Sequence, residues 1–324
     1  MRLSGNARFA GIAAVGAGAS LVIATLALVL PGGANASPGP APASVYSVPS
    51  AAQSAAQSYW TPAGMVAATG GAQRQQAPLG PVYQNAQLAP LFSAARTQNP
   101  PRGTPSPVSF SGVRTVGALF YTKNSGRHFC TASVVNSSTG NLVLTAAHCV
   151  YANGYSSNLE FVPGYDDGGS PYGAWPVKKI IVASGWRQHQ DPSLDYAYLE
   201  VAPPPHSVGP IQSVTGGLSV GFTLHDAHPI TVIGYNDTDQ RPIRCSTRSF
   251  KFDYSQMEFY CRDFWYGTSG GPWIIGYNGG SGHGTVFGVI GGYEAGGLQS
   301  WASYSAIFWR SAPVLFRQAE SAAS

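Results

Sequence analysis

Short apolar runs separated by turn residues fill the chain from Phe110 onward. They are rich in Val, Ile and Tyr, recur about every eight to fifteen residues, and include VGALFYT, NLVLTAA, DYAYLEV, ITVIGY and GTVFGVIGGY. Runs of this length, bounded by turn signals, are typical of an all-β domain. The prolines of VAPPPHSVGP (201–210) cannot donate to a sheet ladder. This stretch therefore predicts a connector between two β-subdomains, at about 115–201 and 211–303.

The two ends of this region have different patterns. The stretch SYSAIFWRSAPVLFRQAES (303–321) carries an apolar stripe and good helix formers, so it predicts a C-terminal helix that starts or breaks near Pro313. Residues 37–107 are dominated by Ala, Pro, Ser and Gln and contain few large aliphatic side chains. Such a composition cannot bury enough apolar surface to offset its ordering entropy. We therefore expect a disordered pro-segment or linker over 37–107.

Residues 1–36 have the three parts of a secretory signal peptide. Arg2 and Arg8 precede an apolar run over 10–30, and the small-residue triplet Ala34-Asn35-Ala36 follows it. An uncleaved membrane anchor is the alternative, because the run is nearly long enough to span a bilayer. Glycines and alanines dilute the run, and a cleavage site follows it. These features favour a cleaved signal and a secreted, extracellular protein with no stable membrane association.

The charge distribution gives no support to nucleic-acid binding. The formal net charge is +4, but residues 108–324 carry 13 Lys or Arg and 14 Asp or Glu. This part is nearly neutral and has no basic stripe that could follow a phosphate backbone. We expect no nucleic-acid partner.

The four cysteines fall into two close pairs. In an oxidising compartment the simplest arrangement is two local disulfides, Cys130–Cys149 and Cys245–Cys261. A zinc site built from His128, Cys130, His148 and Cys149 is the alternative. Ligands adjacent in sequence point apart, and the chain has no C-x-x-C knuckle. We therefore expect disulfides, with no metal and no other cofactor.

The stretch GTSGGPW (267–273) holds a serine in a glycine-rich turn, where it could act as a nucleophile. A serine hydroxyl needs a base, the base needs an orienting carboxylate, and the developing oxyanion needs N–H donors. His148 in TAAHC follows an apolar strand and is the candidate base. Asp195 opens the alternating strand DYAYLEV and is the candidate carboxylate. The N–H groups of Gly267 and Ser269 are the candidate oxyanion donors.

Other polar residues have contexts that favour ordinary loops. The remaining histidines lie in loop-like stretches, and HDAH (225–228) lacks the glutamate of an H-E-x-x-H metal motif. Asp166 and Asp167 lie in the turn GYDDGG, and Asp191 precedes a proline. We assign these three carboxylates to solvated loops.

TAAHC, DYAYL and GTSGGP, in the order His, Asp, Ser, resemble the chymotrypsin-fold, or trypsin-like, serine proteases. The resemblance covers about residues 110–310 and is greatest to the secreted bacterial branch that includes the glutamyl endopeptidases. It implies two six-stranded antiparallel β-barrels with the active site between them, in a protease domain at 108–324. His148 and Asp195 would come from the first barrel and Ser269 from the second. The implied protein is a monomeric endopeptidase that acts on protein or peptide substrates through an acyl-enzyme.

The resemblance also suggests substrate-binding residues. Gly291 and Gly292 would pair through their backbone with the substrate as an added strand. Ile290 matches the position where glutamyl-specific members keep a pocket histidine, so acid specificity is not supported. Asp263, six residues before Ser269, matches the pocket aspartate of members that select Lys or Arg. The choice between a basic specificity and an ordinary loop charge stays open.

Three positions depart from the family pattern. Thr268 replaces the aspartate that animal members pair with a freshly cut N-terminus, so that activation switch is missing. Phe264 and Trp265 replace a small residue and a cysteine. Because these two aromatic residues are unusual in the pocket, a catalytically inactive, protease-like binding protein stays an alternative. An α/β-hydrolase elbow is a weaker alternative, because the only histidine after Ser269 is His283, and both later glutamates follow it.

Overall fold

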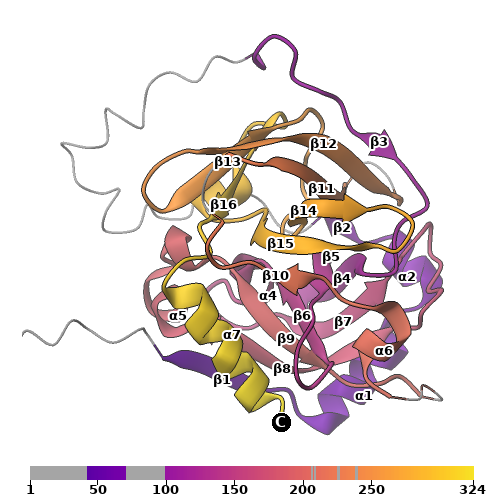
Figure 1. Cartoon of the computed structure of the whole chain (residues 1–324). Helices are drawn as coiled ribbons and strands as arrows, with labels where there is room; N and C mark the ends of the chain where they lie inside the picture. Colours follow the sequence, from indigo (N-terminus) through magenta and orange to yellow (C-terminus); the bar gives the residue numbers. More distant parts are fainter. Residues whose placement is uncertain (1–41, 71–98, 206, 208, 225–226, 238–239) are drawn as a thin grey trace, which may run out of the picture. The chain divides into compact units, whose positions relative to one another are not determined.

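The computed structural model describes residues 42–70, 99–205, 207, 209–224, 227–237 and 240–324 (Figure 1). The described chain is mostly β, as the sequence predicts. It is divided between two sheets, with a helix near the C-terminus.

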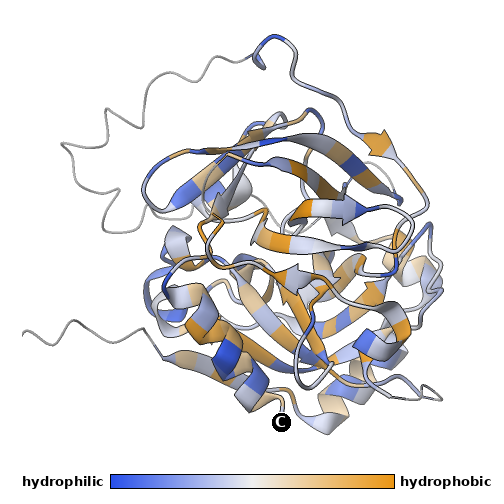
Figure 2. Cartoon of the chain, in the orientation of Figure 1, coloured by the Kyte–Doolittle hydropathy of each residue, from blue (hydrophilic) through white to orange (hydrophobic). Residues whose placement is uncertain are grey.

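The first sheet closes on itself as a barrel. Its six strands pair in the order β8-β7-β4-β5-β6-β9, and β8 also pairs with β9. The strands are β4 (Val116–Lys123), β5 (Gly126–Val134), β6 (Leu142–Thr145), β7 (Ser157–Pro163), β8 (Trp175–Ala183) and β9 (Ala197–Val201). Inward-facing residues such as Leu119, Leu144 and Phe161 form its core. Figure 2 shows hydrophobic residues along these strands.

The second sheet contains six main strands in the order β15-β14-β11-β12-β13-β16, and β10 (Ser219–Val220) is parallel to β15. The strands are β11 (Pro229–Tyr235), β12 (Pro242–Lys251), β13 (Gln256–Tyr260), β14 (Pro272–Asn278), β15 (His283–Val289) and β16 (Ala302–Ala306). The Ser305 hydroxyl joins β15 to β16, because it accepts from the Val289 N–H at 3.0 Å and donates to the Ala306 carbonyl at 2.9 Å. A serine hydroxyl and the backbone bond from the Gly291 N–H to the Tyr304 carbonyl thus connect the two end strands of the second barrel, whereas a strand ladder closes the first.

Short helices and one longer helix connect the strands. They are α4 (Ala147–Val150), α5 (Ser184–His189), η1 (Pro192–Leu194), α6 (Ile211–Thr215), η2 (Tyr293–Gly296) and α7 (Ser311–Ala322). Helix α7 confirms the predicted C-terminal helix, which starts two residues before Pro313. Its residues Ala312, Leu315 and Ala319 are buried, and the helix packs against β1, β8 and β9. No helix in the described part of the chain is long and apolar enough to cross a membrane.

The composition of residues 37–107 predicts disorder, and that prediction is wrong for residues 42–70. This arm forms β1 (Ala43–Ser47), α1 (Ser50–Tyr59), α2 (Pro62–Val66) and β2 (Thr69–Gly70). Strand β1 is antiparallel to β8 over five residues, and β2 is parallel to β5 (Figure 1). Strand β3 (Val108–Ser109) pairs with β12. The predicted signal peptide, 1–36, lies outside the described residues.

A few large side chains anchor the arm. Strand alternation leaves Phe120 and Val162 on the outer face of the first barrel, away from its core. Trp60 covers that face, with its ring centroid 5.2 Å from that of Phe120, and its Nε1 donates to the Asn158 carbonyl at 2.6 Å. Met65 is buried in the same cluster. The composition of the segment does not predict these anchors. A few large side chains are enough to stabilise the arm, because the folded barrel supplies the apolar surface against which they are buried.

Candidate active site

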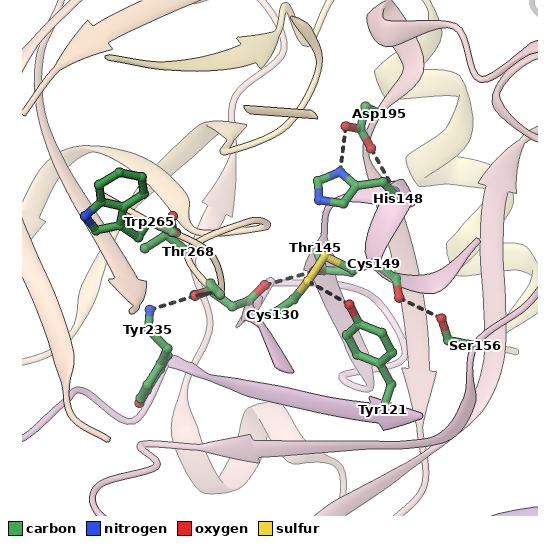
Figure 3. The surroundings of a disulfide bond; sticks show 12 residues. Tyr121, Cys130, Thr145, His148, Cys149, Ser156, Asp195, Tyr235, Trp265 and Thr268 are labelled. Atoms are coloured by element: carbon green, nitrogen blue, oxygen red, sulfur yellow. Dashed lines mark hydrogen bonds and ion pairs between the residues drawn. A yellow bond between two sulfur atoms is a disulfide. The ribbon is translucent and has the colours of Figure 1, made fainter. Parts of the chain in front are cut away.

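Two loops of the first barrel bring His148 and Asp195 together. His148 lies in α4, directly after β6, and Asp195 lies between η1 and β9. Because β6 and β9 are antiparallel neighbours, with Thr145 opposite Ala197, the end of one strand and the start of the other meet. The His148 Nδ1 lies 2.8 Å from Asp195 Oδ2, and the His148 backbone N–H donates to Oδ1 at 2.9 Å (Figure 3).

The Asp195 carboxylate is fully buried and has a third donor from the second barrel. The backbone N–H of Gly292 donates to Oδ2 at 2.8 Å. A buried carboxylate requires such partners, since burial without them is costly. A carboxylate can only accept, so the proton of this ring contact lies on Nδ1, and Nε2 is left as an acceptor. The arrangement can therefore take a proton from a hydroxyl placed at Nε2.

A disulfide fixes the position of α4. Cys130 of β5 is bonded to Cys149, the residue after His148, and the Ser156 hydroxyl donates to the Cys149 carbonyl at 2.9 Å (Figure 3). The other disulfide, Cys245–Cys261, joins β12 to the end of β13. Both predicted pairings are confirmed.

One possible metal-ligand group exists among the described residues, formed by Cys130, His148 and Cys149. The two sulfur atoms are bonded to each other, so neither is a thiolate that could bind zinc. The zinc alternative has no thiolate ligands in this structure.

The loop that carries Ser269 packs against the first barrel. The Ser269 carbonyl accepts from the Thr131 N–H at 2.7 Å. At Gly270, where φ is +80°, an added Cβ would lie 2.1 Å from the Thr131 carbonyl oxygen and 3.0 Å from the backbone nitrogen of Ala146. Ala146 is two residues before His148. Only glycine permits this approach, which brings the serine loop onto the segment that carries the histidine.

The N–H groups of the serine loop divide into two sets. Those of Thr268, Gly270 and Gly271 donate to the carbonyls of Trp265, Ile290 and Thr268 respectively. Those of Gly267 and Ser269 have no acceptor among the described residues. Buried N–H groups are normally paired, and an unpaired set next to a serine is what an oxyanion requires. Gly267 has a φ of +91°, as a turn of this kind needs.

Thr131 joins the two barrels beneath this loop, and Thr145 supports it from the neighbouring strand of the first barrel. Neither residue is among the site residues predicted from the sequence. The Thr131 hydroxyl donates to the Gly267 carbonyl at 3.0 Å and accepts from the Tyr235 N–H at 2.8 Å. The Thr145 hydroxyl donates to the Thr131 carbonyl at 2.9 Å. Each is a threonine in a largely apolar run, CTASVV or NLVLTAA. A hydroxyl in such a run is the sequence signal that predicts a buried side-chain hydrogen bond.

The predicted specificity residues occupy different environments. Asp263 is an exposed turn residue with a φ of +61°, and its carbonyl accepts from the Asn236 amide at 2.6 Å. This placement fits the loop-charge alternative. Ile290 is fully buried, its N–H donates to the Gly271 carbonyl, and Phe264 lies in the same core. Ile290 supports the serine loop through its backbone.

The expected pairing of Gly291 and Gly292 with a substrate strand does not fit their N–H groups. The Gly291 N–H donates to the Tyr304 carbonyl at 2.9 Å, and the Gly292 N–H donates to Asp195. Both donors are already used within the protein, so pairing of this segment with a substrate strand would have to use a carbonyl, and it stays a prediction. Sequence alone could identify the glycine pair but not the partners of its amides.

Comparison with known proteins identifies the family. The trypsin family model matches residues 107–305, more than half of the chain. The chain therefore belongs to the trypsin family and is a serine peptidase. The match ends just before α7, so the helix lies beyond it.

Solved structures share the fold. The protease Anisep from Arthrobacter nicotinovorans is 24% identical, with a TM-score of 0.59, and covers 66% of this chain and 98% of its own. The thermostable serine protease AL20 from an extremophilic microorganism is 24% identical, with a TM-score of 0.57. The match covers 64% of this chain and 97% of AL20. A Glu endopeptidase in complex with MPD is 18% identical, with a TM-score of 0.54 and coverages of 68% and 98%. At these identities the likeness concerns the fold.

A curated relative is the protein named extracellular metalloprotease from Bacillus subtilis (strain 168). It is 28% identical over 154 residues, which are 45% of this chain and 47% of the relative. The chain thus matches about half of that protein's length.

Proposed function

We propose that this serine peptidase is a secreted endopeptidase whose nucleophile, base and orienting carboxylate are Ser269, His148 and Asp195. One observation carries the proposal. His148 is hydrogen-bonded to a fully buried carboxylate, next to a serine loop in which two N–H groups have no acceptor in the described part of the chain. The residue types and their order match the nucleophile, base and orienting group of acyl transfer.

The reaction follows from this geometry. The Ser269 oxygen attacks the carbonyl carbon of a peptide, and Nε2 of His148 takes the hydroxyl proton. The N–H groups of Gly267 and Ser269 donate to the oxyanion, while Asp195 stabilises the imidazolium. His148 then gives its proton to the leaving amine, the C–N bond breaks, and the acyl-enzyme remains. Water deprotonated by His148 attacks the ester, and the proton returns to Ser269 as the acid product leaves.

Export is the second part of the proposal. The basic start, apolar run and A-x-A triplet of residues 1–36 support it, and two disulfides suit an oxidising compartment. We place the protease domain at 108–324 and treat 37–107 as a pro-segment. Because residues 42–70 are docked on the first barrel, we expect them to resist trimming. N-terminal sequencing of secreted protein should begin at or after Ser37, and an intact Met1 on membrane-bound material would contradict export.

Turnover of an unstructured protein substrate such as casein tests the endopeptidase activity. The purified chain should cleave it, a serine-directed sulfonyl fluoride should abolish cleavage, and the Ser269→Ala protein should be inactive. A chelator should have no effect, which separates this proposal from metal-dependent hydrolysis, the activity in the name of the curated relative. The alternative, an inactive protease-like binding protein, predicts a folded chain that binds peptides without cleaving them. Light scattering should give the mass of a monomer.

A further inference from the structure

Residues 290–292 bond to both halves of the active site. On one side, the Ile290 carbonyl accepts from the Gly270 N–H at 2.7 Å, and the Ile290 N–H donates to the Gly271 carbonyl at 2.9 Å. On the other side, the Gly292 N–H donates to Asp195. A span of three residues therefore connects the loop of Ser269, in the second barrel, to the carboxylate of the first.

The directions of successive N–H groups explain why Asp195 can take this place. Along an extended strand they alternate between the two edges. The Gly291 N–H points to Tyr304 of β16, so the Gly292 N–H points to the opposite edge. There it donates to the Asp195 carboxylate at 2.8 Å.

Glycine at both positions lets the chain approach Asp195 closely. An added Cβ at Gly291 would lie 2.9 Å from the Asp195 carbonyl oxygen and 3.0 Å from its Oδ2. Gly292 has φ +77° and ψ −126°, a backbone conformation that is essentially limited to glycine. The turn takes the chain out of the strand direction, and the next N–H, of Tyr293, donates to Gln256 Oε1 at 3.0 Å.

We propose that Ile290, Gly291 and Gly292 form a brace that aligns the His148–Asp195 pair with Ser269 across the barrel interface. Gly292 is then a positioning residue that acts through Asp195, and the inference rests on the proposed function of that triad. The brace couples the two barrels at the atoms where a small displacement matters most. Misplacing reacting groups by about 1 Å can cost about 100-fold in rate.

Gly292→Ala tests the brace, with Gly276→Ala as a matched control. An added Cβ at Gly292 would lie 2.2 Å from Gln256 Oε1 and 2.9 Å from the Ala306 nitrogen, so the turn must shift. Gly276 also has a positive φ, of +64°, but no atom lies within 4 Å of an added Cβ. We expect Gly292→Ala to lower kcat by about 100-fold with KM unchanged. The control should keep both constants.

Proton NMR provides a readout that does not depend on turnover. The proton between His148 Nδ1 and Asp195 should resonate far downfield, and Gly292→Ala should shift or broaden it while Gly276→Ala does not. A raised KM with an unchanged kcat would overturn the proposal and restore the substrate-binding edge. Unchanged constants and an unchanged resonance would also overturn it.

Amide exchange keeps the test valid if Gly292→Ala does not fold. In the wild-type protein the Gly292 amide should be protected, and Asp195→Ala should expose it while the Gly291 amide, bonded to Tyr304, stays protected. Equal exchange of the Gly292 amide in both proteins would contradict the brace. A wild-type chain that cleaves nothing would instead refute the proposed function, and the resonance and exchange data would still report on the brace.

Discussion

The two halves of the proposed active site are held in place by different means. In the first barrel, side chains fix the site: His148 is bonded to Asp195, and the Cys130–Cys149 disulfide fixes the helix turn. In the second barrel, the loop's own side chains play little part: its backbone makes close contacts at Gly270 and hydrogen bonds over residues 267–271, one of them to the Thr131 hydroxyl. The first half therefore depends on the side chains of His148, Asp195 and the disulfide, and the second depends on the lack of a side chain at Gly270. Removing atoms should disable one half, and adding atoms should disable the other.

Removing the proposed nucleophile or the proposed base should have the largest effect on turnover. We expect Ser269→Ala and His148→Ala each to lower kcat by about 10⁴- to 10⁶-fold, because each is needed for the same step. The double variant should be scarcely slower than either single variant. Steady-state kinetics on a peptide substrate measure this, and additive losses would mean that the two residues do not act together.

Changing the buried carboxylate should lower kcat nearly as much. Asp195→Asn should lower kcat by about 10⁴-fold, because an amide can stabilise the wrong histidine tautomer. Asp191→Asn is the control. Asp191 caps η1 by accepting from the Ser193 N–H at 2.9 Å and from the Ser193 hydroxyl at 2.8 Å, and Asn retains a capping oxygen. It should keep activity within a few-fold. The reverse order of losses would overturn the assignment of Asp195.

Adding one methyl group should disable the second half. Gly270→Ala would place a Cβ 2.1 Å from the Thr131 carbonyl oxygen, so we expect it to lower the free energy of unfolding by about 3 kcal/mol or more. Gly103→Ala is the control, because its φ is also positive, +83°, with no atom within 4 Å. That change should lower the free energy of unfolding by only about 1 to 2 kcal/mol, through backbone strain alone. Denaturant unfolding measures both, and equal losses would show that the close contact does not matter.

Removing the two disulfides in turn should separate stability from activity. Replacing both cysteines of either pair with Ala should lower the free energy of unfolding by about 3 kcal/mol. Only the Cys130–Cys149 pair adjoins His148, so only its loss should also lower kcat. Urea unfolding and kinetics on the two double variants test this. Equal activities would mean that the disulfide does not position the histidine.

Glu160 of β7 should make the stability of the first barrel depend on pH. Burial raises the pKa of this carboxyl to about 7, so the folded chain keeps a proton that the unfolded chain loses from pH 4.5 upward. Stability should therefore fall as pH rises from 4.5 to about 7, and level off above that. Glu160→Gln should remove this decline and stabilise the protein above pH 7 by about 3 kcal/mol at most. Denaturant unfolding of the wild-type and Glu160→Gln proteins at several pH values tests this prediction. If the stability of the two proteins changed with pH in the same way, the result would contradict it.

The sequence predicts the elements that depend on local pattern. The two β units, helix α7, both disulfides and the meeting of His148 with Asp195 follow from alternation, spacing and the order of motifs. The arm does not, because β1 and β2 are stabilised by pairing with β8 and β5, far away in the chain. The role of Gly292 does not either, because a backbone N–H has no sequence signature and its acceptor is set by tertiary packing.

Covalent labelling tests the central claim most directly. A fluorophosphonate reacts with a serine only when a base and oxyanion donors activate it, so the wild-type chain should be labelled once, at Ser269, as mapped by mass spectrometry. His148→Ala should abolish the label, and Asp191→Asn should retain it. A folded wild-type chain that takes up no label, or takes it up on another serine, would contradict the account.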